Sequence, residues 1–147
     1  MEIQKFAQKF IIYNPKKDAI LVNKYLTSKY LPVKLINKFC LPGGQVAFGM
    51  SPLDSALQEV QEETGVKIKP WEILNCWSWT YKKDEDDKQI CAIARIGLYV
   101  SGQIKPPKEQ METTLSRARW IKIKDLDVER FVFDEIPALK MFLSKYF

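Results

Sequence analysis

Alternating apolar and polar residues predict a β-hairpin near the start of the chain. Residues 6–13 and 19–25 are two strand-like runs, and Asn14-Pro15-Lys16-Lys17-Asp18 between them has the composition of a turn. A short strand over 38–41 then leads into Pro42-Gly43-Gly44, where the backbone needs the conformational freedom of glycine.

Two longer strands are predicted in the second half of the chain. Residues 66–81 and 89–101 are the two strand-like segments, and the charged stretch 82–88 between them is typical of a solvated hairpin tip. After a loop at Pro106-Pro107, residues 117–122 form a further short strand.

Two segments follow the period of a helix. The first begins at Ser51, an expected N-cap followed by Pro52, and runs to Thr64 before Gly65 ends it. Its buried face is predicted from i, i+3, i+4, i+7 spacing: Leu53, Ala56, Leu57, Val60 and Thr64. A C-terminal amphipathic helix is expected over 136–146.

Strands mixed with helices on one chain predict an α/β or α+β layered sandwich. The chain has 147 residues and contains no repeat, low-complexity tract or linker-like stretch, so we expect a single domain over 1–147.

The absence of histidine restricts the chemistry more than any other count. It excludes a Ser-His or Cys-His nucleophile pair, an imidazole base and a His-ligated metal, so carboxylates, Lys, Tyr or Cys must carry any proton transfer. Cys40, Cys76 and Cys91 are widely spaced and suit the reducing cytoplasm. No apolar run is long enough for a membrane span.

The first helix carries a cluster of acids without basic neighbours. Residues 45–66 contain no Lys or Arg, whereas Glu59, Glu62 and Glu63 lie beside the predicted buried stripe. These like charges repel each other near the helix C-terminus, where the macrodipole favours cations. A bound divalent cation would relieve both effects, and oxygen ligands suit Mg²⁺, or Mn²⁺ as a substitute. The alternative interpretation is a plain solvated helix face.

The spacing around these acids resembles the Nudix box of MutT-like hydrolases, written G-x5-E-x7-R-E-U-x-E-E-x-G-U with U a bulky aliphatic residue. Seven of its nine specified positions match across the 23 residues from Gly44 to Val66, and Leu41-Pro42-Gly43-Gly44 is similarly typical. The two departures are Met50 in place of the first Glu and Gln58 in place of the Arg. In the family that Arg holds and orients the neighbouring glutamates, whereas Gln58 brings no charge.

The resemblance implies a Nudix-type α/β/α sandwich with a mixed sheet between helices. It also implies metal-dependent hydrolysis of a nucleoside diphosphate linked to another moiety. Metal ions would be held by Glu59, Glu62, Glu63 and the Gly44 carbonyl, and Glu62 or Glu59 would take the proton from the attacking water. Outside the box, Glu109 and Glu112 lie where many relatives place an additional glutamate, although both also fit plain surface charge.

Residues for substrate contact are predicted on the strands and on a basic loop over 26–38. Trp77 and Trp79 share one strand face with Ile73, Asn75 and Tyr81, and would stack on a base unless they belong to the sheet core. Arg95, alone in an apolar strand, would meet a phosphate, a box carboxylate or a sheet-edge acid. The loop Phe48 is expected to cap the core, and four lysines could steer an anionic substrate: Lys24, Lys29, Lys34 and Lys38.

The leading hypothesis is a cytoplasmic, Mg²⁺-dependent pyrophosphohydrolase of a small nucleotide derivative. The candidate substrates are nucleoside triphosphates (including oxidised ones), nucleotide sugars, ADP-ribose and dinucleoside polyphosphates. One alternative is a module that binds a nucleotide without cleaving it, to which Met50 and Gln58 give support. The other is an RNA-binding or cap-processing protein, suggested by the net charge of +5 but disfavoured by the lack of interleaved basic and aromatic residues. A homodimer through strand edges stays open.

Overall fold

The computed structural model describes residues 1–26, 33–108 and 115–147 of the chain. Its two helices are α1 (Pro52–Thr64) and α2 (Ile136–Tyr146). Its strands are β1 (Glu2–Asn14), β2 (Ala19–Lys24), β3 (Phe39–Cys40), β4 (Gly43–Gln45), β5 (Lys67–Lys83), β6 (Asp86–Ser101) and β7 (Arg119–Lys122).

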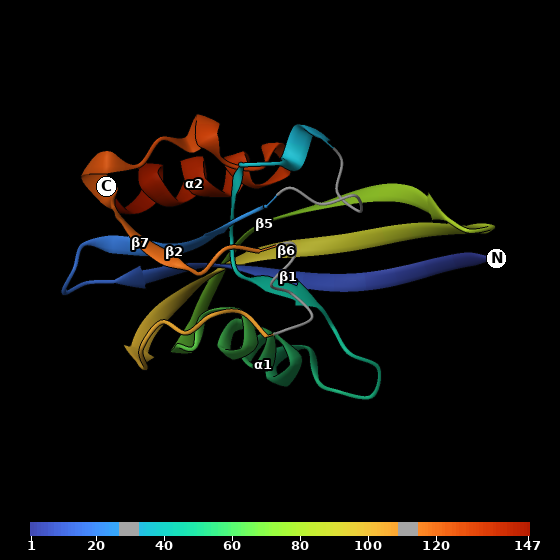
Figure 1. Ribbon diagram of the computed structural model, residues 1–147, viewed down its shortest axis with the longest axis horizontal. Helices are drawn as coiled ribbons and strands as arrows, with labels where there is room; N and C mark the ends of the chain where they lie inside the picture. The colour runs from blue at the N-terminus through green and yellow to red at the C-terminus, as the bar shows by residue number, and fades with distance from the viewer. Residues whose placement is uncertain (27–32, 109–114) are drawn as a thin grey trace.

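The strands form one mixed sheet in the order β3-β2-β1-β6-β5 (Figure 1). β1 runs parallel to β6 from Glu2↔Asp87 to Tyr13↔Leu98, and the other pairs are antiparallel. β4 pairs with β1, and β7 pairs with β2. The long strands β1, β6 and β5 lie side by side in that order and project together beyond the helices (Figure 1).

The sheet lies between the two helices, so the predicted α/β/α sandwich is confirmed (Figure 1). On one face, Ala138, Leu139 and Phe142 of α2 pack in a buried cluster with residues of β1, β2, β3 and β6. On the other face, Ala56 and Val60 of α1 pack in a second cluster with β1 and β2. Both helices bury an apolar stripe, which is the main stabilising term for such an arrangement.

The helix signals in the sequence are confirmed to the residue. The Ser51 Oγ accepts a hydrogen bond from the Asp54 N–H at 3.1 Å, Pro52 is the first helical residue, and Gly65 ends α1 at φ 85°. The predicted strand positions also hold, although β1 begins earlier than expected, at Glu2, and the hairpin tip is shorter. The Pro-Gly-Gly segment enters a short strand, β4, that pairs with β1.

Three burial predictions are wrong. Leu53 is 42% exposed, whereas Ser55, which the predicted stripe left out, is buried and accepts a hydrogen bond at its Oγ from the Ala47 N–H at 2.9 Å. Phe48 does not cap the core and is fully exposed. Ile73 does not share a face with Trp77, because β5 shifts register between Ile73 and Asn75, so that Ile73 is exposed and Leu74 packs on the core.

Two further findings concern cysteines and membrane spans. Cys40, Cys76 and Cys91 are all free thiols, and Cys40 alone of the three is buried. Within the described ranges, neither helix has the length and apolar character required to cross a bilayer.

Candidate active site

The candidate site lies where β4 and the following loop meet α1. β4 is fixed on β1 through the pairs Gln8↔Gly44 and Lys9↔Gly43. The Gln8 amide also donates to the Pro52 carbonyl at 2.9 Å, which ties the start of α1 to the same strand. The sheet therefore positions both Gly43-Gly44 at the start of β4, called the glycine loop below, and the helix that carries the three glutamates.

Glu63 joins the helix to the glycine loop. The residue is 6% exposed, and its Oε2 accepts a hydrogen bond from the Gly43 N–H at 2.9 Å. Burial raises the pKa of Glu63 to about 7, against the opposing effects of Lys9 and of the Gly43 hydrogen bond. Glu63 is thus held rigidly, and without a further cation it titrates near neutral pH.

Glu59 packs directly against Gly44. A Cβ added at Gly44 would lie 3.1 Å from the Glu59 Oε2, so the missing side chain lets the carboxylate approach the loop backbone closely. Burial raises the pKa of Glu59, and the negative charge of Glu62 raises it further. The repulsion expected from the sequence therefore acts on Glu59, whose own negative charge also raises the pKa of Glu63.

Glu62 has two hydrogen-bond donors on one oxygen. The Gln58 Nε2 donates to Glu62 Oε1 at 2.8 Å, and the Lys108 Nζ donates to the same atom at 2.5 Å. The Lys108 hydrogen bond, and after it the Gln58 hydrogen bond, lowers the pKa of Glu62. Of the three box glutamates, Glu62 alone has its negative charge stabilised in this way.

The donors of the site suit a hard divalent cation. Among the residues that the structure describes, no three acidic or thiol groups are close enough together to enclose a metal ion. Mg²⁺ does not require such a cage, because it is usually bound by one or two carboxylates, with waters and substrate phosphates completing its coordination. Glu59 beside Gly44, with Glu62 on the adjoining turn, therefore fits Mg²⁺ better than a metal that needs a closed protein site.

Two titratable residues next to the glycine loop, Glu135 and Lys9, were not predicted from the sequence. The Glu135 carboxylate is 4% exposed, and its Oε1 accepts from the Leu41 N–H at 2.5 Å. The Lys9 Nζ lies 3.5 Å from the Gly43 carbonyl oxygen. Burial alone would lower the pKa of Lys9, but Tyr25, Glu135 and Glu63 raise it overall. Lys9 interrupts an apolar strand, and that interruption is the signal that could have identified it.

The titration of Glu135 should appear as a pH-dependent stability. Burial raises the pKa of Glu135 from 4.5 to about 7, so the folded state keeps a proton that the unfolded chain releases. This contribution is fully present below pH 4.5 and is lost as the pH rises through 7. Relative to the Glu135→Gln variant, the wild type should lose stability from pH 5 to 7, by about 1.4 kcal/mol per pH unit at most.

Urea unfolding of both proteins at pH 5, 6, 7 and 8 measures this difference. The glutamine side chain keeps an acceptor for the Leu41 N–H, and comparison of the two proteins cancels the titration of the groups that do not interact with Glu135. Parallel stability curves for the wild type and the variant would show that Glu135 does not titrate in this range.

The predicted substrate residues on the strands are not gathered at the box. Trp77 and Trp79 are partly buried and pack on a cluster of Ala7, Ile90 and Ala92, as sheet-core residues would. Arg95 donates to the Trp71 carbonyl oxygen from Nη2 at 3.0 Å and from Nε at 3.3 Å. No ion pair within residues 1–26, 33–108 and 115–147 includes Arg95. Their contact with substrate stays a prediction.

The predicted basic loop and the additional glutamates are described only in part. Lys29, Glu109 and Glu112 fall outside the described residues. The Lys24 Nζ lies 5.7 Å from the centre of the Phe39 ring. Lys38 donates to the Glu129 carbonyl oxygen at 3.4 Å.

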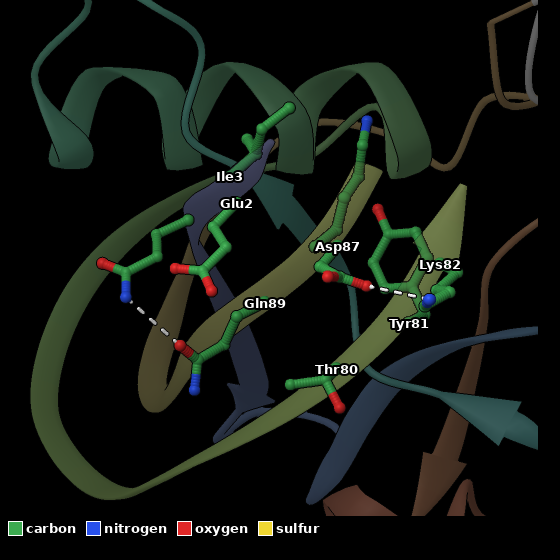
Figure 2. Close-up of a pocket in the computed structure, with 9 residues that line it drawn as sticks. Glu2, Ile3, Thr80, Tyr81, Lys82, Asp87 and Gln89 are labelled. Carbon is green, nitrogen blue, oxygen red and sulfur yellow. Dashed lines mark hydrogen bonds and ion pairs between the residues drawn. The ribbon is translucent and has the colours of Figure 1, made fainter. Parts of the chain in front are cut away.

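A cavity of about 450 Å³ lies at the projecting end of the sheet and contains none of the predicted site residues (Figure 2). Residues of β1, β5 and β6 line it, and Figure 2 shows a Lys82–Asp87 ion pair, with 3.6 Å between Nζ and Oδ1, beside a hydrogen bond to Gln89. Because these polar groups pair with each other, the box is the stronger candidate for chemistry.

Comparison with known proteins identifies the family and the fold of the chain. A family model of the NUDIX domain matches residues 6–142. A NUDIX hydrolase from Nitrosomonas europaea has a similar structure, with 17% identity over 97% of this chain and 90% of that chain and a TM-score of 0.72. The MutT NUDIX hydrolase from Burkholderia pseudomallei gives 17% identity over 95% and 98%, with a TM-score of 0.70. A UDP-X diphosphatase gives 17% identity over 97% and 64%, with a TM-score of 0.65.

At these identities the solved structures establish the fold, an α+β sandwich. The match over residues 6–142 establishes more: the chain belongs to the NUDIX domain family. It is accordingly a hydrolase that acts on phosphoanhydride bonds. Members of this family generally use divalent metals.

Proposed function

We propose that the protein is a Mg²⁺-dependent pyrophosphohydrolase that uses Glu59, Glu62 and Glu63 to cleave a nucleoside diphosphate linked to another moiety. One observation carries the proposal: the Glu63 carboxylate is hydrogen-bonded to the Gly43 N–H while the Glu59 carboxylate lies against Gly44. The helix and the glycine loop thus form one surface with clustered negative charge, for which a cation is the natural complement.

In the proposed mechanism the residues of this surface serve as metal ligands, and one of the glutamates also serves as the general base. Glu59, Glu63 and the Gly44 carbonyl would hold the metal, with Glu62 as a further ligand. When bound, Mg²⁺ supplies charge neutralisation on the diphosphate and a lowered pKa for the attacking water. Glu62 or Glu59 would accept the proton of the attacking water, because the chain has no histidine.

The test is a panel of nucleoside triphosphates, nucleotide sugars, ADP-ribose and dinucleoside polyphosphates, each with Mg²⁺, with Mn²⁺ and with excess chelator. We expect at least one compound to release a nucleoside monophosphate, and we expect chelation to stop the reaction. Product formation that continues at full rate in chelator would contradict the metal dependence.

A nucleotide-binding module without turnover is the second candidate. It is supported by Met50, which removes one carboxylate from the box, and by Gln58, which removes its cation. Calorimetry that finds tight nucleotide binding, with no product over hours in Mg²⁺, would favour it over the hydrolase.

The remaining proposals concern the organisation and setting of the chain. The match over residues 6–142 supports a single domain, and the three free cysteines support a reducing compartment such as the cytoplasm. β5 ends the strand order and could pair with a second copy of the chain.

A further inference from the structure

The Nudix box of this chain lacks its usual arginine, but a different cation, Lys108, contacts the box residue Glu62. Gln58 stands where the family has an arginine, and its Nε2 donates to Glu62 Oε1 at 2.8 Å, one helical turn further on. This hydrogen bond orients the carboxylate but supplies no charge. The charge comes from Lys108, which lies 46 residues after Glu62 in the chain. The Lys108 Nζ is 2.5 Å from the same Glu62 oxygen.

Lys108 is held in place by its backbone as well as by its ammonium group. The Lys108 N–H donates to the Glu62 carbonyl oxygen at 3.2 Å, and the Lys105 N–H donates to the Thr64 carbonyl oxygen at 3.0 Å. The segment after β6 therefore lies along the last turn of α1, where free carbonyls and the macrodipole favour a cation. In this ion pair the Glu62 side chain is 12% exposed and the Lys108 side chain is 49% exposed, so solvent screens the pair mainly from the lysine side.

Both donors contact Oε1, which leaves Oε2 without a donor among the described residues. We infer that Gln58 and Lys108 together replace the arginine of the Nudix box: Gln58 supplies the orienting hydrogen bond, Lys108 supplies the charge, and the Glu62 Oε2 is left to face the metal and diphosphate. Lys108 is then a positioning residue for the reaction. The inference rests on the proposed function, because it assigns Glu62 a role in that reaction.

The metal-free protein provides the first test, through Lys108→Met, Gln58→Arg and the double variant. Lys108→Met should lower the melting temperature, and Gln58→Arg in the same chain should restore it, since the new guanidinium reaches the same carboxylate. In a Glu62→Gln background both changes should have little effect, because they act through Glu62. Equal shifts with and without Glu62 would overturn the inference.

Turnover provides the second test, on whichever substrate of the panel is cleaved. Lys108→Met should lower kcat about tenfold with a smaller change in KM, and Gln58→Arg should recover most of the loss. The affinity for Mn²⁺, measured without substrate, should stay equal or rise, because a neighbouring positive charge has been removed. The matched control is Lys105→Met, which removes a lysine of the same segment that makes no ion pair with Glu62.

The outcomes separate this inference from the proposed function. Unchanged kcat in Lys108→Met, or no recovery by Gln58→Arg in a folded protein, would show that Lys108 forms only a surface ion pair. A gain in kcat on removal of Lys108 would show that it competes with the metal, which also overturns the inference. If the wild type cleaves nothing on the panel, the proposed function fails, while the metal-free cycle still decides whether Lys108 and Gln58 act together on Glu62.

Discussion

Replacement of Glu63 by glutamine should remove most of the metal-dependent turnover and leave the fold intact. The glutamine side chain would keep a carbonyl oxygen for the Gly43 N–H, so the loop and helix remain joined. It would lose the negative charge that a divalent cation requires at this position. We expect kcat to fall by about two orders of magnitude or more at saturating Mg²⁺.

Stability provides an internal check on the same variant. Burial raises the pKa of Glu63 to about 7, so ionisation of this carboxyl group at alkaline pH lowers the free energy of unfolding. The amide has no such charge, so the variant should be at least as stable as the wild type in metal-free buffer at pH 8. Asp54→Asn is the matched control, because it removes a carboxylate from the exposed first turn of the same helix. Equal rates for wild type and Glu63→Gln would refute the assigned site.

The elements that the sequence predicted best are those specified by local signals. Ser51-Pro52 and Gly65 determine the two ends of α1 through a side-chain cap, a fixed φ and a left-handed stop, all within a few residues. The box spacing then places Glu59, Glu62 and Glu63 on that helix without any knowledge of the sheet. The fold class and the family follow from the same short segment.

Features that depend on distant contacts were not predictable in this way. Glu135 meets the Leu41 N–H across 94 residues, and neither position has a local pattern that indicates the other. The loop at Pro106-Pro107 likewise carries no local pattern that places Lys108 beside Glu62. In β5 the alternation of faces fails after Ile73, because a register shift with β6 depends on the partner strand.

Gly43→Ala should destabilise the protein more than Gly44→Ala or Gly49→Ala, the other glycine-to-alanine changes between β3 and α1. The φ of Gly43 is +135°, a conformation that L-residues rarely adopt, and a Cβ there would lie 2.0 Å from the Gln8 carbonyl oxygen. That oxygen belongs to the backbone of β1, so no side-chain rotation relieves the overlap, and β4 must separate from β1. We expect a loss of about 3–5 kcal/mol in the free energy of unfolding.

Gly49→Ala is the matched control, because Gly49 also has a positive φ, +83°, but a Cβ there meets no atom within 4 Å. It should cost only the backbone term of about 1–2 kcal/mol. Urea unfolding of both variants measures the difference in the free energy of unfolding. Turnover should also fall more in Gly43→Ala, because separation of β4 removes the Gly43 N–H from Glu63 and Gly44 from Glu59. If the two substitutions cost the same, the close packing of β4 on β1 does not hold the site together.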